Sequence, residues 1–290
     1  MKRKQYSKVA TLLGIALLIF PEQSEGTSLI VIRTRDHVIL ASDDRVTDIR
    51  GQIEDKQINK ISFSAVSSVV IGITGTATTP RCDLVDVARR IADGNKFADQ
   101  ADLHYMAQKW AEFTRGCFAT EVRNHAPEVA RILVERAKAN QGLYTDAIFV
   151  GVGKNGDILI SASSAMIKMD PKGNLKPIVK EVIDIPVDGL GVTVIPRAYA
   201  IQTKARIEKE VPKNKEHLAI LAGFGSRDES VQVCAAARLT AVAGEWYPQS
   251  VGGETKVAIL DRKGIRWPKI PDNCRKSHPS TSSTPTTPPK

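Results

Sequence analysis

The sequence lacks the features that mark several common classes of protein. It has only four cysteines, none in a Cys-x-x-Cys pair, and only five histidines, none in a metal-ligand cluster, among its 290 residues. We therefore expect no zinc site and no other metal site. No Gly-x-Ser-x-Gly elbow is present, which argues against a Ser-His-Asp hydrolase. No basic run carries interleaved aromatic residues, so we expect no nucleic-acid partner despite a formal net charge of +9.

The composition is that of one ordinary globular domain. Apolar residues make up 42% of the chain and charged residues 25%, which is enough for a substantial core. No internal repeat or linker divides residues 27–268, so we predict a single domain there. Residues 269–290 are rich in Ser, Thr and Pro, and we predict a disordered tail.

The cysteines are isolated in the sequence. We expect Cys117 and Cys234 to be buried free thiols, as isolated cysteines commonly are. Cys274 falls in the predicted tail. If the chain is exported, one disulfide can form, but the spacing does not choose its partners.

Residues 1–26 have the parts of a removable leader. Three basic residues in the first four positions precede an apolar run over 9–20 that is too short to span a bilayer comfortably. Small residues, Ser24 and Gly26, occupy the −3 and −1 positions of a cleavage site before Thr27. Three interpretations stay open: an export signal, which would place the protein in the periplasm or outside the cell; a propeptide that Thr27 itself cuts from a cytoplasmic chain; and an uncleaved membrane anchor. The first two both make Thr27 the N-terminal residue.

The mature chain alternates between β-hairpins and groups of helices, with a polar loop over 48–55. Strands are expected over residues 27–33, 37–41, 58–64, 67–74, 145–152, 158–163, 175–185, 256–260 and 265–267. Helices are expected up to about residue 92, over 101–139 with a break near Gly116 or Pro127, and over 196–210, 216–222 and 230–246. This order predicts an α+β fold in which two antiparallel sheets pack face to face between helical layers, a four-layer αββα sandwich.

Five residues in or just after the first four expected strands fit a single site. Thr27 begins the first strand, and the hairpin returns Asp43 and Arg45 to its side at the end of the second. Lys60 is expected on the third strand and Gly75 at the end of the fourth. If the chain is cut just before Thr27, that residue carries both a hydroxyl nucleophile and a free amine, which is one way to activate threonine.

Several stretches of the chain resemble one known family. They are residues 27–31 with 41–47, then 55–61, 72–77 and, more weakly, 250–264. These stretches resemble proteasome β subunits and, more broadly, the N-terminal nucleophile hydrolases. The resemblance implies a threonine-type peptidase or amide hydrolase that needs no cofactor, acts on a peptide or protein, and forms a homo-oligomer, of which a ring is one form.

The resemblance also implies a role for each residue of the constellation. The Thr27 hydroxyl attacks the carbonyl carbon while its α-amine accepts the proton. Lys60 is a nearby cation that lowers the pKa of its neighbours, and Asp43 pairs with it. Arg45 braces the loop through backbone carbonyls, and the Gly75 N–H binds the oxyanion.

A substrate pocket and one departure follow from the same resemblance. The pocket positions are all apolar, which favours a hydrophobic side chain before the scissile bond: Val46, Ile58, Ile73 and Ala77. The family has an Asp and a Ser that support the amine, but here Pro248 and Val251 occupy those places. Glu245 and Ser250 are the nearest candidates for that support. Two other functions therefore stay open: an inactive scaffold or binding subunit of the same fold, and a small-amide acylase.

Overall fold

The computed structural model describes residues 28–47, 53–124, 127–138, 144–185, 191–195, 215–246 and 251–275. The predicted leader, Thr27, Ser250, Pro248 and the helix expected over 196–210 lie outside these residues. Among the residues described, no helix combines the length and the apolar character needed to cross a membrane.

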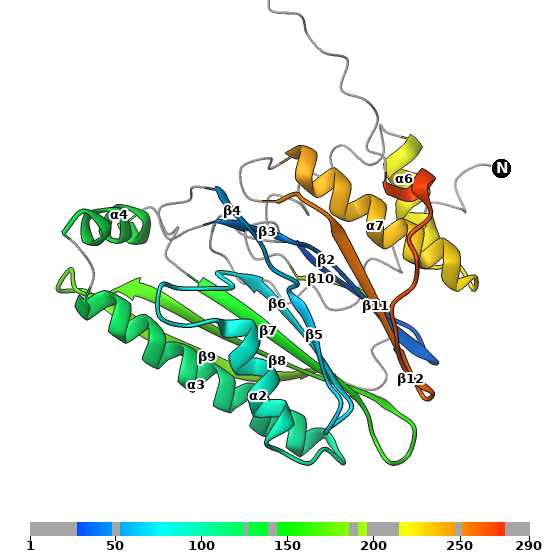
Figure 1. Ribbon diagram of the computed structural model, residues 1–290, viewed down its shortest axis with the longest axis horizontal. Coiled ribbons are helices and arrows are strands. Elements are labelled where there is room, and N and C mark those ends of the chain that lie inside the picture. Colours follow the sequence, from blue (N-terminus) through cyan, green and yellow to red (C-terminus); the bar gives the residue numbers. More distant parts are fainter. Residues whose placement is uncertain are drawn as a thin grey trace, which may run out of the picture.

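Over the described residues, the strands form two five-stranded antiparallel sheets and a small ribbon (Figure 1). The first sheet has the spatial order β10 (Gly191–Ile195), β1 (Leu29–Arg33), β2 (His37–Asp43), β11 (Thr255–Asp261) and β12 (Gly264–Arg266). The second has the order β5 (Ile61–Ser64), β6 (Val69–Gly75), β7 (Tyr144–Val152), β8 (Ile158–Met169) and β9 (Leu175–Ile185). The ribbon pairs β3 (Arg45–Thr47) with β4 (Ile53–Gln57).

The two sheets bury a shared apolar layer. Leu29, Leu40 and Leu260 of the first sheet belong to one buried cluster with Val70 and Ile148 of the second. Gly72 on β6 makes the close approach possible, since a Cβ atom there would lie 2.8 Å from a methyl group of Leu29. Alternate residues of both sheets therefore face each other, as the expected strand patterns imply.

Helices cover the other face of each sheet, and Figure 1 shows them on opposite sides of the molecule. α2 (Leu84–Asp93) and α3 (Gln100–Asn124) pack on the second sheet, where Trp110 is fully buried. α6 (Lys215–Phe224) and α7 (Glu229–Trp246) pack on the first sheet. The expectation of a mixed fold with two antiparallel sheets and helices is confirmed.

Local capping and proline chemistry set two helix boundaries. The Asp83 carboxylate accepts hydrogen bonds from two backbone N–H groups at the start of α2. The helical region expected over 101–139 is two helices, because α3 ends at Asn124 and α4 (Pro127–Lys138) begins with a proline, which is favoured in the first turn of a helix. The break therefore lies at Pro127 and not at Gly116, which is inside α3.

Three strand predictions need correction. β9 has the predicted bounds, but β4 lies partly within the loop expected over 48–55, and β10 was not expected at all. The strand expected over 58–64 begins only at Ile61, so Lys60 precedes it. β10 pairs with β1, which is distant in sequence, and period-two alternation does not report such a partner. β4 and β5 pair with their neighbours in sequence, β3 and β6, so those two differences concern only the bounds of the strands.

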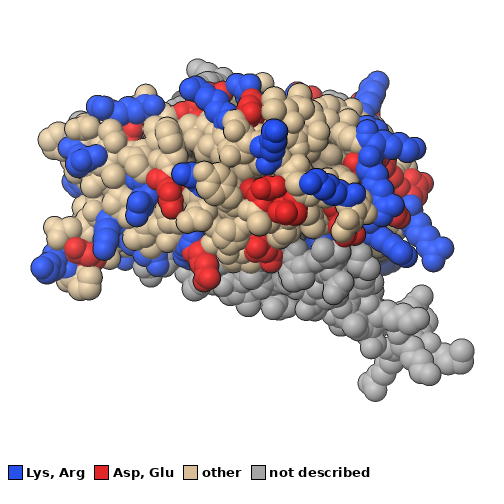
Figure 2. All heavy atoms as spheres, turned by 90° about the horizontal axis from the view of Figure 1, so that it is seen from below, with Lys and Arg blue, Asp and Glu red and all other residues tan. Residues whose placement is uncertain are grey.

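The charged side chains on the face of α2 and α3 are of both signs. Figure 2 views the molecule from below the orientation of Figure 1, and basic and acidic groups are interspersed over much of that face. On α2, for example, Arg89 donates to the Asp86 carboxylate at 2.6 Å.

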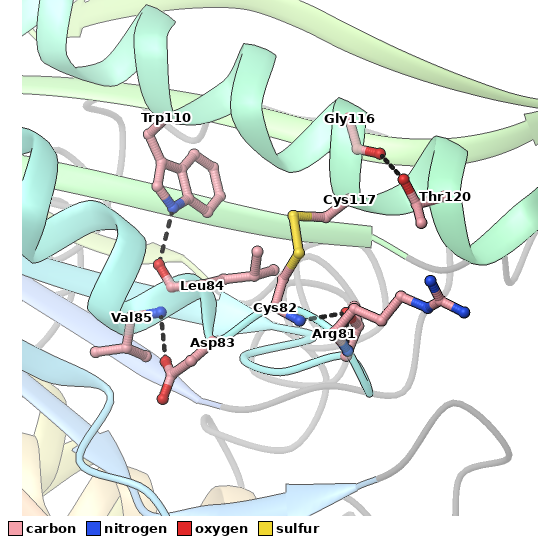
Figure 3. The surroundings of a disulfide bond; sticks show 10 residues. Arg81, Cys82, Asp83, Leu84, Val85, Trp110, Gly116, Cys117 and Thr120 are labelled. Carbon is pink, nitrogen blue, oxygen red and sulfur yellow. Dashed lines mark hydrogen bonds between the residues drawn. A yellow bond between two sulfur atoms is a disulfide. The ribbon is translucent and has the colours of Figure 1, made fainter.

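The cysteines form two disulfides, so the expectation of buried free thiols is wrong. Cys82 is bonded to Cys117 on α3 (Figure 3), and Cys234 on α7 is bonded to Cys274. Cys274 lies in a short helix, α8 (Asp272–Arg275), and is 2% exposed. The folded region therefore continues past the predicted boundary at 268. Spacing could not reveal these pairs, because the tertiary fold brings together residues 35 and 40 positions apart.

Candidate active site

Asp43, the last residue of β2, links three segments of the chain. Its Oδ1 accepts the backbone N–H of Ser28 at 2.9 Å, and its Oδ2 accepts the N–H of Gly252 at 3.2 Å and the Lys60 ammonium at 3.3 Å. The Ser28 nitrogen is bonded to the carbonyl carbon of Thr27. The Asp43 carboxylate therefore anchors the chain one peptide bond from the predicted nucleophile.

Lys60 is buried against that carboxylate. Its side chain has no exposed surface, and Nζ also donates to the backbone carbonyl of Arg45. Burial disfavours the charged form and lowers the pKa of Lys60, while the nearby Asp43 carboxylate opposes the shift. Burial likewise raises the pKa of Asp43, opposed by the Lys60 charge. The prediction that Asp43 and Lys60 pair is confirmed, although Lys60 stands before β5 and not on a strand.

Arg45 braces the turn that precedes β11, through backbone carbonyls. Its guanidinium donates to the Val251 carbonyl at 3.2 Å, and its backbone N–H donates to the Gly252 carbonyl at 3.1 Å. A Cβ atom at Gly252 would lie 2.5 Å from the guanidinium carbon. A side chain at residue 252 would therefore have to displace the guanidinium from the turn.

Asp44 is a site residue that sequence reasoning missed. It is 2% exposed, and its Oδ1 accepts the Glu254 N–H at 2.7 Å. Gly253, with φ of 80°, passes so close that a Cβ atom there would lie 2.0 Å from the same oxygen. Two features of the sequence could have indicated this contact: the adjacent acidic residues Asp43 and Asp44 at a strand end, and the distant pair Gly252-Gly253.

Gly75 ends β6 opposite Thr145 on β7 and has φ of 81°, a conformation that favours glycine. The Thr145 hydroxyl donates to the backbone carbonyl of Thr74 at 3.1 Å. This hydroxyl was also missed, because nothing in the sequence pairs residue 145 with residue 74.

The four predicted pocket positions lie together. All belong to one hydrophobic cluster and are at most 8% exposed: Val46, Ile58, Ile73 and Ala77. The cluster continues into α2 through Leu84 and Val85. The segment 76–83, which joins Gly75 to α2, is tethered to α3 by the disulfide at Cys82 (Figure 3).

A pocket of about 400 Å³ lies on the α7 side of Asp43. It is lined by Asp43 and Arg45, by residues 251–255, and by four residues near the end of α7: Thr240, Ala241, Gly244 and Glu245. Glu245 therefore reaches the same pocket as two residues of the site. Ser250, the other candidate for supporting an amine, lies outside the described residues.

No protein-family model matches the chain, and no curated protein matches it either. The case for a function therefore depends on the residues of the site. The structure brings Asp43, Arg45 and Lys60 together beside the N–H of Ser28, and it places Glu245 at the neighbouring pocket.

Proposed function

We propose that this protein is a threonine-type amide hydrolase, most simply a peptidase. Its nucleophile is Thr27, which becomes the N-terminal residue when the chain is cleaved after Gly26. The observation that carries the proposal is the Asp43 carboxylate, which holds both the Ser28 N–H and the buried Lys60 ammonium. This arrangement sets a cation next to the residue that follows Thr27. We propose that the fold is the four-layer αββα sandwich of the N-terminal nucleophile hydrolases, with which this arrangement of residues is compatible. The resemblance of the sequence to proteasome β subunits supports the same assignment.

The proposed reaction needs only groups of the chain and water. The Thr27 hydroxyl oxygen attacks the carbonyl carbon of the substrate, and the hydroxyl proton passes to the free α-amine, whose reference pKa of about 7.7–8.0 suits a base at neutral pH. Lys60 favours the alkoxide by its charge, and the Gly75 N–H binds the oxyanion. The leaving amine takes the proton from the α-amine. Water then hydrolyses the Thr27 ester, which releases the acid and restores the hydroxyl.

The disulfides support export of the protein. The sequence has four cysteines, and the two disulfides use all of them. Structural disulfides persist in oxidising compartments and are rare in the cytosol. We therefore favour an export signal in residues 1–26, followed by a mature chain that begins at Thr27 in the periplasm or outside the cell.

An inactive scaffold or binding subunit is the second candidate, and one observation favours it. Val251 stands where the family has a polar residue that supports the amine, and its side chain is apolar and 1% exposed. If no other group supports the amine, the fold remains but the base is weakened. Glu245 at the neighbouring pocket is the group we propose for that support.

A peptide epoxyketone tests the proposal, because its stable adduct requires both a hydroxyl and a free amine on one residue. We expect the mature protein and a Thr27→Ser variant to be labelled, and a Thr27→Ala variant to remain unlabelled. Absence of labelling in wild-type protein with a free Thr27 would favour the scaffold. Labelling of the Thr27→Ala variant would show that the reactive residue is another one.

A further inference from the structure

Thr145 makes a buried hydrogen bond at the proposed oxyanion donor. Its hydroxyl donates to the Thr74 carbonyl oxygen at 3.1 Å, and both side chains are fully buried. Thr145 lies directly opposite Gly75 in the ladder between β6 and β7. The hydroxyl is therefore fixed by the sheet itself and not by a loop.

The Thr74 carbonyl and the Gly75 N–H belong to the same planar peptide unit. Because that unit is rigid, a partner that fixes the oxygen also fixes the direction of the N–H on its other side. Gly75 has φ of 81°, and glycine occupies positive and negative φ about equally readily. The glycine itself therefore does not fix the orientation of this peptide unit, which depends on the pairing of β6 with β7 and on the Thr145 hydroxyl.

We propose that Thr145 is a positioning residue, which holds the 74–75 peptide so that the Gly75 N–H points at the developing oxyanion. This inference rests on the proposed function, in which that N–H stabilises the tetrahedral intermediate. Donation to the Thr74 carbonyl also polarises the peptide, which makes the Gly75 N–H a stronger donor. Thr145 itself touches no reacting atom.

The test compares Thr145→Val, which keeps the shape of the side chain but loses the hydroxyl, with Thr145→Ser, which keeps the hydroxyl. Complete loss of one oxyanion donor lowers kcat by about 10²–10³-fold, so misalignment of this donor should lower kcat by roughly 10-fold or more. We expect Thr145→Val to show that loss, with KM changed less than about twofold since ground-state binding is unaffected. Thr145→Ser should retain most of the wild-type kcat.

Thr120→Val is the matched control. Thr120 on α3 also donates its hydroxyl to a backbone carbonyl, that of Gly116 at 3.0 Å, but it lies outside the proposed site. We expect wild-type kcat in this control. If Thr145→Val does not fold, Thr145→Ala and Thr145→Ser provide the same comparison, because both lose the methyl group and only one loses the hydroxyl.

Different results would overturn the role of Thr145 and the proposed function. A Thr145→Val enzyme with kcat within about twofold of wild type, or a Thr145→Ser enzyme as impaired as Thr145→Val, overturns the role of Thr145 while leaving the threonine hydrolase in place. Wild-type protein that neither hydrolyses peptides nor reacts with the epoxyketone overturns both.

Discussion

The Lys60 ammonium lies 3.3 Å from the Asp43 carboxylate, and the two side chains are 0% and 1% exposed. Each charge is removed from water and depends on the other, and on backbone groups, for compensation. The same carboxylate accepts the Ser28 N–H. The ion pair therefore both supports the start of β1 beside the end of β2 and forms the electrostatic centre of the proposed site.

Lys60→Met should abolish epoxyketone labelling and also destabilise the fold. Removal of one partner leaves the other charge buried and uncompensated, which typically lowers the free energy of unfolding by about 3–5 kcal/mol. Urea unfolding and labelling of the same preparation measure the two effects. An Asp43→Asn, Lys60→Met double variant should regain part of the stability but none of the reactivity. Wild-type labelling of Lys60→Met would remove Lys60 from the mechanism.

The two disulfides should differ in their effect on activity but not in their effect on stability. They close loops of similar length, with sequence separations of 35 and 40, and loss of either should lower the free energy of unfolding by about 2–4 kcal/mol. Only Cys82–Cys117 tethers the segment 76–83 next to Gly75. We therefore expect slower labelling in Cys82→Ser, Cys117→Ser protein than in Cys234→Ser, Cys274→Ser protein, compared at a temperature where both are folded. Equal labelling rates would show that the tether does not influence the site.

Gly253→Ala should be far more harmful than Gly173→Ala. The two glycines have φ of 80° and 84°, so both substitutions carry the same backbone strain, of about 1–3 kcal/mol. Among the residues that the structure describes, a Cβ atom at Gly173 has no neighbour within 4 Å, whereas one at Gly253 would lie 2.0 Å from the Asp44 carboxylate. Thermal unfolding should therefore show a larger loss for Gly253→Ala, and labelling should fall as well because Asp44 adjoins Asp43 and Arg45. Equal losses would mean that the turn moves freely away from Asp44.

The ion pair between Glu229 and Arg266 should make stability depend on acid pH. The guanidinium donates to both carboxylate oxygens, at 2.8 and 2.7 Å, and these hydrogen bonds lower the pKa of Glu229 below its ordinary value of 4.5. The stabilisation is therefore complete above about pH 4.5 and is lost as the pH falls through the lower pKa of the folded state. The side chains of Arg266 and Glu229 are 46% and 35% exposed, so solvent screening limits the effect to about 1 kcal/mol.

Urea unfolding of wild type and Glu229→Gln at a series of pH values measures this contribution. Wild type should be the more stable protein at pH 7, and the difference should shrink in acid. A difference that stays constant down to pH 3 would show that the interaction does not depend on the Glu229 charge.

The parts of the site that are close in sequence could be predicted. β1 and β2 form a hairpin, so the pattern of their residues was enough to bring Asp43 back beside the start of β1. The almost wholly apolar run of β6 likewise indicated a strand with Gly75 at its end. These predictions depend on local alternation and turn signals, which the sequence carries directly.

The parts that depend on distant contacts could not be predicted. β10 is a strand because it pairs with β1, and Cys274 on α8 forms a disulfide with Cys234 on α7. The bond from Thr145 to Thr74 joins residues 71 positions apart. A single sequence reports the chemistry of each of these residues but not the tertiary contact that uses it.

The most direct test of the central claim is mass spectrometry of the mature protein after treatment with the epoxyketone and digestion with trypsin. Thr27–Arg33 is the first tryptic peptide if the chain begins at Thr27, since Arg33 is the first basic residue after it. We predict that this peptide carries the adduct on Thr27 and has no residue of the leader attached. Protein that hydrolyses peptides while Thr27 is still joined to Gly26, or an adduct on any other residue, would contradict the proposal.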